Sequence, residues 1–254
     1  SLAALSIRDF MVATCFMVVL ICFGLDKNKR LKKILAFPAE MAPLRTEPLE
    51  LITELMPGLK EEDGKIKETL EALSLRAGER YISLGIGKNL LPLIIAMQGV
   101  HVTGVDISPE ALAFQMQMLD RFGRHLSQRG SFAVYNLNFD DPYTGTKPIP
   151  GFVVPDYAKM MSSFDIVECV YFNHREGEAD LAQILLNLSK PGARFFVSAP
   201  GGSFSSLDRT AQALINATAS KSDRPQLEVV ATGLYVSTCH SNNYGVVLQP
   251  SSQI

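Results

Sequence analysis

Residues 81–87 read Tyr-Ile-Ser-Leu-Gly-Ile-Gly, and this stretch decides the fold class. Its first four residues form a short apolar run that is typical of a buried strand, and Gly85 and Gly87 follow at once. Residues 89–98 are interpreted as a helix. A strand, a glycine turn and a helix in this order begin a βαβ unit, the repeating element of a parallel sheet.

The same alternation continues along the chain, and two consecutive strands without a long helix between them close it. Crossovers of this kind are right-handed and leave helices on both faces of the sheet. The sequence therefore predicts a three-layer, Rossmann-like α/β fold, mostly parallel with an antiparallel C-terminal hairpin, preceded by an apolar N-terminal helix. The expected strands are 81–84, 101–105, 132–135, 164–170, 194–197, 228–237 and 244–249, and the expected helices of this domain are 62–75, 89–98, 108–124, 177–188 and 207–219.

Composition limits the function classes. The chain has 254 residues, with 24 Lys and Arg against 26 Asp and Glu, and 47% of its residues are hydrophobic. These values fit one folded domain with an appendage, and they argue against a dedicated nucleic-acid binder, which usually has a broad basic surplus. The 4 Cys show no zinc-ligand spacing, so we expect no metal site.

The N-terminus differs from the rest of the chain. Residues 10–25 are apolar and uncharged, and basic residues gather directly after them, at 27–33. As a helix this run spans ~24 Å, which is short of the ~30 Å hydrocarbon core of a bilayer. Either it anchors the chain to the cytoplasmic face of a membrane through residues 10–33, or residues 10–25 pack on the chain's own domain or in an oligomer interface, which would make the protein cytoplasmic.

We therefore divide the chain into an apolar helix with a basic flank (1–33), a linker with a cap helix (34–61) and the main domain (62–254). Residues 138–161 form the longest stretch without a clear period, and loops of this length are usually functional or mobile.

Candidate ligand-binding residues gather at the carboxyl ends of the first strands, where open α/β sheets bind ligands. Gly85 and Gly87 let the backbone approach a ligand closely, although a glycine turn here also has purely steric causes. Asp106 ends the second strand, and a carboxylate there can accept both hydroxyls of a ribose. It could instead be a helix N-terminal acid, but Ser108 could fill that capping role and leave Asp106 free.

Two later blocks extend this pattern. Residues 163–167 read Ser-Phe-Asp-Ile-Val, and 190–193 read Lys-Pro-Gly-Ala before the fifth strand. With the glycine turn and Asp106, this order of motifs resembles the class I S-adenosylmethionine-dependent methyltransferases over roughly residues 62–250. The resemblance implies S-adenosylmethionine as the cofactor and methyl transfer as the activity.

The resemblance also implies roles for single residues. Gly85 and Gly87 would face the methionine part of the cofactor, Asp106 would bind its ribose, and Ile107 would pack on its adenine. Further adenine contacts would come from Asn136 and Leu137, which follow the third strand.

The sequence departs from the family pattern at the glycine turn. Ser83 stands where the family has an acid that helps to hold the cofactor's ammonium group, and Asn89 replaces the third glycine. Lys88, inside the turn, either pairs with the cofactor carboxylate or points to solvent. Glu168 on the fourth strand must face the site or find a partner if it is buried, so we include it with Ser83 among the candidate cofactor-binding residues.

The segment after the fourth strand lies beside the expected methyl position. His174 is the candidate general base and Tyr171 a candidate orienting group, unless His174 simply begins a surface helix. We expect methyl transfer to a small-molecule or lipid-like acceptor. The alternative is a non-catalytic scaffold with a degenerate cofactor site, whereas a nucleotide-dependent oxidoreductase fits worse because Leu90 stands where the last glycine of its motif should be.

Overall fold

The computed structural model describes residues 63–139, 141–143, 145–169, 178–199, 204–235 and 244–251. The chain divides into two compact units, Ser1–Arg45 and Thr46–Ile254, and all described residues belong to the second unit. The expected N-terminal helix and its basic flank lie outside the described residues. Within the described part, no helix combines the length and the apolar character that crossing a bilayer requires.

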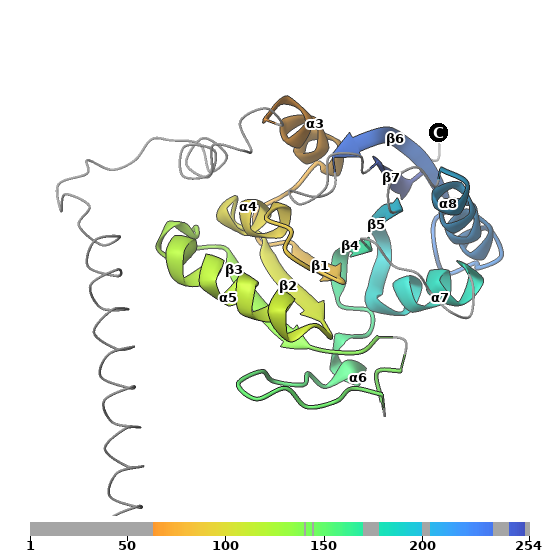
Figure 1. The fold of residues 1–254 in the computed structure, drawn as a ribbon. Helices are drawn as coiled ribbons and strands as arrows, with labels where there is room; N and C mark the ends of the chain where they lie inside the picture. Colours follow the sequence, from red (N-terminus) through yellow and green to blue (C-terminus); the bar gives the residue numbers. More distant parts are fainter. Residues whose placement is uncertain are drawn as a thin grey trace, which may run out of the picture. The chain divides into compact units, whose positions relative to one another are not determined.

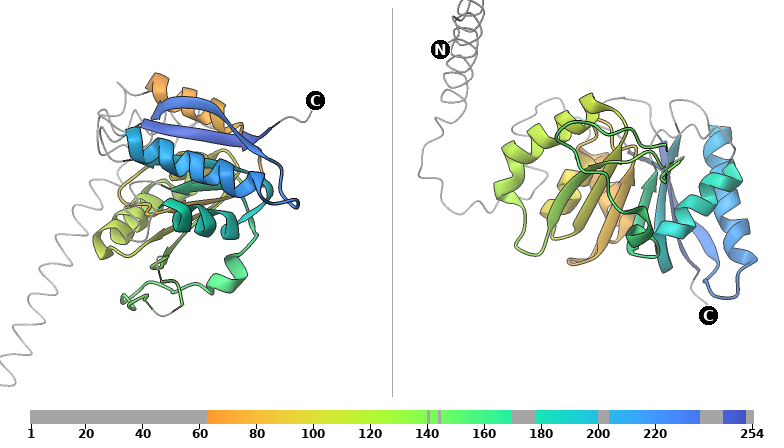
Figure 2. Two further views of the ribbon diagram at one scale, coloured as in Figure 1. Left: turned by 90° about the vertical axis from the view of Figure 1, so that its right-hand side faces the viewer. Right: turned by 90° about the horizontal axis from the view of Figure 1, so that it is seen from below.

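Seven strands in the described residues form one sheet in the order β3-β2-β1-β4-β5-β7-β6 (Figure 1). Neighbouring strands are parallel from β3 to β5, whereas β7 is antiparallel to both β5 and β6. Helices cover both faces of this sheet (Figure 2). The predicted fold of the main domain is therefore confirmed. The elements are α3 (Asp63–Leu73), β1 (Arg80–Leu84), α4 (Leu91–Met97), β2 (His101–Asp106), α5 (Pro109–Phe122), the 3₁₀ turn η2 (Gly123–His125), β3 (Ser131–Asn136), α6 (Tyr157–Met160), β4 (Phe164–Cys169), α7 (Glu178–Leu188), β5 (Ser189–Ala199), α8 (Phe204–Ala219), β6 (Leu227–Tyr235) and β7 (Tyr244–Pro250).

Two elements differ from the expectation. Strand β5 begins at Ser189 rather than Arg194, so the Lys-Pro-Gly-Ala segment lies inside the strand. The pairing with β4 jumps from Phe164–Ser189 to Ile166–Arg194, and Gly192 takes a φ of +80° within the resulting bulge. The second difference is α6, a short helix inside the stretch that was expected to lack regular structure.

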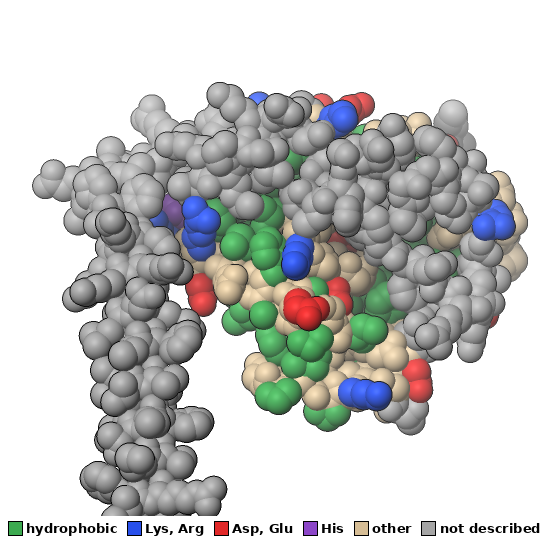
Figure 3. Space-filling view, in the orientation of Figure 1, with side chains coloured by type: hydrophobic (Ala, Val, Ile, Leu, Met, Phe, Trp, Pro, Cys, Tyr) green, Lys and Arg blue, Asp and Glu red, His purple; other side chains and the backbone are tan. Residues whose placement is uncertain are grey.

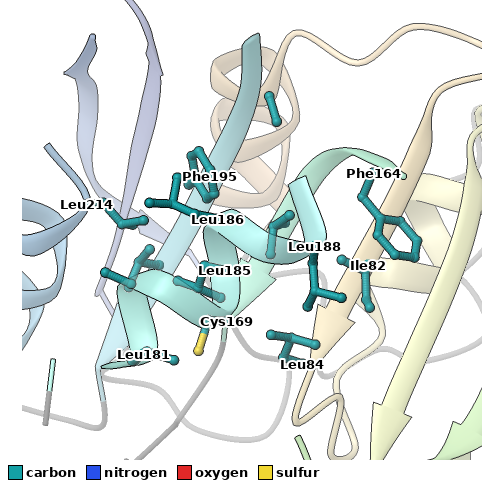
Figure 4. Packing of buried hydrophobic residues seen from close by; sticks show 14 of the residues in the cluster. Ile82, Leu84, Phe164, Cys169, Leu181, Leu185, Leu186, Leu188, Phe195 and Leu214 are labelled. Atoms are coloured by element: carbon teal, nitrogen blue, oxygen red, sulfur yellow. The ribbon is translucent and has the colours of Figure 1, made fainter. Parts of the chain in front are cut away.

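Alternation along the strands builds a core on each face of the sheet. Successive side chains of a strand point to opposite faces. Tyr81 accordingly joins the cluster under α3, α4 and α5, while the next residue, Ile82, joins the cluster under α6, α7 and α8 (Figure 4). Full burial of one large apolar side chain contributes about 1.5–3 kcal/mol, so both faces stabilise the sheet and fix the register of its strands.

The order of strands also defines where a ligand is expected. The chain leaves β1 toward β2 and β3 on one side, and then returns to the other side of β1 to form β4. This reversal is the topological switch point of the sheet, and open α/β sheets bind ligands outside the carboxyl ends of the strands there.

Candidate functional site

The glycine turn is tied to the end of β2. Gly85 and Gly87 have φ values of +68° and +53°, a left-handed conformation that side chains other than glycine rarely adopt. The N–H groups of Gly85 and Ile86 both donate to the carbonyl of Val105, at 2.9 and 3.1 Å. The turn therefore needs its glycines for backbone conformation, whatever else it does.

Asp106 connects this turn to the start of α5. Its Oδ2 accepts a hydrogen bond from the N–H of Gly87 at 2.9 Å, and its Oδ1 accepts one from the N–H of Ser108 at 2.8 Å. Ser108 does cap α5 through the N–H of Ala111, as expected, but the expectation that this leaves Asp106 free is wrong. A carboxylate has about four acceptor positions, so this half-exposed side chain can still accept a hydroxyl at each oxygen.

Gln115 of α5 holds the turn from the other side, and it is not among the residues predicted from the sequence. Its Nε2 donates to the carbonyls of Gly87 and Asn89, at 2.9 and 2.7 Å. The backbone of Gly87 is thus held at its N–H by Asp106 and at its carbonyl by Gln115. The available signal was a polar residue within the buried face of this helix, between Leu112 and Met118.

Asn136 and Ile107 stand at the neighbouring strand ends, where Asn136 is the register partner of Asp106. The Asn136 amide nitrogen donates to the carbonyl of Lys147 at 2.7 Å, whereas its buried Oδ1 has no hydrogen-bond partner among the described residues. Ile107 is 60% exposed, so an apolar ring could pack against it. Leu137 is fully buried in the core cluster that includes Tyr157 and Met160 of α6.

A second polar group lies at the switch point itself. Ser83 and Glu168 are register partners on β1 and β4, one residue before each strand ends, and Tyr81 points to the same face. All three side chains are buried, and no described residue completes a hydrogen bond of ordinary geometry with their oxygen atoms.

Burial is the dominant electrostatic influence on this group. It raises the pKa of Glu168 to about 7, although the nearby hydroxyls of Ser83 and Tyr81 act in the opposite direction. Burial, followed by the charge of Glu168, raises the pKa of Tyr81 well above its ordinary value. Tyr81 therefore stays neutral near pH 7, whereas Glu168 is poised between its two protonation states.

The structure describes two of the four remaining sequence-predicted residues, Lys88 and Asn89. Lys88 is exposed, and Asn89 is buried with its Oδ1 accepting the N–H of Leu91, the first residue of α4. His174 and Tyr171 lie outside the described residues, so their catalytic roles stay predictions. No group of three or more His, Cys, Asp or Glu side chains within the described ranges could hold a metal ion.

The described candidates therefore form two neighbouring groups. Asp106, Ile107 and Asn136 lie at the ends of β2 and β3, while Ser83 and Glu168 lie at the ends of β1 and β4, with the glycine turn attached to both β1 and β2. Over the end of β2, hydrophobic side chains gather around exposed acidic ones (Figure 3). This combination suits a ligand with a polar sugar, an apolar ring and a cationic group.

Several known proteins are similar to this chain over part of its length. No protein-family model matches the chain. A ubiquinone biosynthesis O-methyltransferase of Xylella fastidiosa (strain 9a5c) is 27% identical over 123 residues, which are 48% of this chain and 42% of that protein. The chain thus matches less than half the length of this curated relative, and the protein of the same description from strain M23 matches to the same extent.

Two solved methyltransferase structures also align with the chain. A SAM-dependent methyltransferase from Aquifex aeolicus aligns with a TM-score of 0.49 and 14% identity, over 73% of this chain and 89% of that one. A TehB-like SAM-dependent methyltransferase from Corynebacterium glutamicum gives a TM-score of 0.49 and 12% identity, over 80% and 98% of the two chains. From its strand order and its partial sequence match, the chain resembles the class I S-adenosylmethionine-dependent methyltransferases, as expected.

Proposed function

We propose that the chain is an S-adenosylmethionine-dependent methyltransferase that acts on a small-molecule acceptor. The observation that carries this proposal is the hydrogen bond between Asp106 and the N–H of Gly87. It joins the acid at the end of β2 and the glycine turn after β1 into one rigid unit beside the switch point. The resemblance to methyltransferases in motif order, and the O-methyltransferase named above, support the same function.

The described residues fit this cofactor. Asp106 has acceptor positions for the ribose hydroxyls, Ile107 offers an exposed apolar surface for the adenine, and Asn136 has an unpartnered carbonyl oxygen that could accept the adenine amino group. When bound, S-adenosylmethionine supplies a methyl group activated by a sulfonium. The protein's own task is to hold this group in line with the acceptor atom, which accounts for a large part of the catalysis in such displacements.

Binding of S-adenosylhomocysteine, measured by isothermal titration calorimetry, tests the cofactor assignment. The wild-type chain should bind it, and Asp106→Asn should weaken binding at least about tenfold, because charged acceptors contribute about 1.5–3 kcal/mol per hydrogen bond. Asp120→Asn is the matched control, since Asp120 is an exposed acid on α5 outside the site, and it should bind like the wild type. Equal affinity of the two variants would contradict the assignment.

A non-catalytic scaffold is the second candidate, and Ser83 favours it because the family has an acid at this position. A scaffold of this kind should bind neither S-adenosylmethionine nor S-adenosylhomocysteine. Ser83→Asp should then fail to create binding. The same titrations, made with wild type and Ser83→Asp, therefore separate the two candidates.

For the acceptor, we propose an apolar or lipid-like molecule. Tyr143, Val153 and Val154 are exposed apolar residues of the 138–161 stretch, and the carbonyl of Val153 accepts the N–H of Asn136 in the candidate site. Exposed apolar side chains beside a polar site favour a ligand with an apolar body. Replacing Val153 and Val154 together by Ser should raise the KM for a long-chain phenol at least severalfold while leaving the affinity for S-adenosylhomocysteine unchanged.

A further inference from the structure

The register of β1 and β4 places the carboxylate of Glu168 beside Ser83, two residues before the first glycine of the turn. Ser83 pairs with Glu168, and Leu84, the last residue of β1, separates Ser83 from Gly85. Ser83 pairs on its other side with Gly104 of β2, which has no side chain. Of the two described residues that pair with Ser83, only Glu168 has an ionisable side chain.

The described protein compensates the burial of Glu168 only in part, through the nearby hydroxyls of Ser83 and Tyr81. Its side chain is 0% exposed, and both carboxylate oxygens lack a hydrogen-bond partner among the described residues. No described Lys, Arg or His forms an ion pair with it. Buried carboxylates are normally paired, because an isolated one costs several kcal/mol, so this group either stays protonated or receives a cation from outside the described chain.

The position of Glu168 favours the second possibility. It lies one residue before the carboxyl end of β4, at the switch point where ligands bind in sheets of this kind. A group needed only for packing could be apolar, like its register partner Phe196 on β5. The ligand under the proposed function carries an ammonium group at its amino-acid end, which can donate hydrogen bonds to a carboxylate.

We propose that Glu168 receives the ammonium group of the bound ligand, so that β4 supplies the carboxylate that Ser83 on β1 does not. This inference rests on the proposed function, because that function defines the ligand. Glu168 is then a binding residue, and the Ser83 and Tyr81 hydroxyls beside it adjust the position of its carboxylate.

Two related ligands test this contact by calorimetry. S-adenosylhomocysteine has the ammonium group and a neutral sulfur, whereas methylthioadenosine keeps the nucleoside and lacks the amino-acid end. Glu168→Gln preserves the shape of the side chain and removes its charge. It should therefore weaken the binding of S-adenosylhomocysteine at least about tenfold and leave the affinity for methylthioadenosine unchanged. The matched control is Asp165→Asn, which removes a carboxylate near the other end of the same strand and should affect neither ligand.

The outcomes separate the inference from the function on which it rests. If wild type binds neither ligand, the proposed function fails and the inference fails with it. If wild type binds both ligands and Glu168→Gln binds S-adenosylhomocysteine equally well, only the inference is overturned. An equal loss of affinity for both ligands also overturns the inference, because Glu168 would then act through the shape of the nucleoside site.

A second measurement needs no variant. The ratio of the affinities for S-adenosylhomocysteine and methylthioadenosine should rise about tenfold between pH 6 and pH 8, as the ionised fraction of Glu168 increases. The titratable group facing Glu168 in the described structure is Tyr81 on the neighbouring strand, and its raised pKa keeps it neutral over this range. A constant ratio would overturn the contact.

Discussion

Glu168 makes the stability of the free protein depend on pH. Burial raises its pKa from 4.5 in the unfolded chain to about 7 in the folded one. Between these values the folded state holds a proton that the unfolded state has lost, so the stability contributed by protonated Glu168 is fully present below about pH 4.5 and is lost as the pH rises through about 7. A rise of this size corresponds to about 3 kcal/mol.

The prediction is that Glu168→Gln removes this pH dependence. Chemical denaturation at pH 5 and pH 8 should show wild type and variant close together at the lower pH, with the variant more stable by up to about 3 kcal/mol at the higher pH. The difference between the two proteins is the relevant quantity, because all other carboxylates titrate in both. A difference that does not change with pH would show that Glu168 does not titrate as described.

The positions of candidate site residues could be predicted from the sequence where they follow from the order of the strands. The positions of Gly85, Gly87 and Asp106 were predictable because each ends or follows a strand. The bonding of Asp106 was not, since its two internal hydrogen bonds depend on how the turn folds back over β2. The register of Ser83 against Glu168 was also beyond reach, because 85 residues separate the two and sequence spacing carries no information on their alignment.

Among the elements, the glycine turn packs closely against β2 at Gly104, which has no side chain. A Cβ placed at Gly104 would lie 2.4 Å from Cδ1 of Ile86, the buried residue between the two glycines of the turn. Gly104→Ala should therefore push Ile86 out of position and destabilise the protein by about 1–3 kcal/mol, as overpacking usually does. Thermal or urea denaturation measures this loss.

A second substitution checks the cause. Ile86→Val removes Cδ1, the atom that the new methyl group would meet most closely. The double variant Gly104→Ala/Ile86→Val should recover much of the stability lost by Gly104→Ala, so the two changes should couple favourably in a double-mutant cycle. Simple additivity would show that Gly104 is needed for a different reason.

The existence and order of the strands and helices were predictable because apolar runs and turn residues alternate regularly. The start of β5 was not, since Pro191 and Gly192 are typical of a turn and the structure accommodates them in a bulge. Tertiary pairing with β4 outweighs the local preference there. The short helix α6 was missed because four residues are too few to show a period.

In the whole domain, Arg194 connects three separate parts of the chain. It forms an ion pair with Glu79, just before β1, and donates to the carbonyls of Leu73 and Ser74 at the end of α3. The side chains of Arg194 and Glu79 are only 11% and 18% exposed. Arg194→Met should therefore cost about 3–5 kcal/mol, because it leaves a nearly buried Glu79 carboxylate without its cationic partner, although the N–H of Arg76 still donates to it.

The exposed pair between Lys159 and Asp156 provides the control, since their side chains are 83% and 51% exposed. Lys159→Met should leave the denaturation midpoint unchanged, because water and salt already screen such pairs. Similar losses of stability from both substitutions would contradict the importance given to burial.

Membrane contact through residues 10–33 stays a prediction, since these residues lie outside the described structure.

The place of β7 in the sheet determines what the loss of this strand would do to the protein. It lies between β5 and β6 and is the only strand that β6 pairs with among those described. A proteolytic cut that removed residues 244–250 would uncover the backbone donors and acceptors of two strands at once. Exposed edges of this kind recruit strands from other molecules, so damage to this short C-terminal segment would favour aggregation of the whole protein over gradual local loosening.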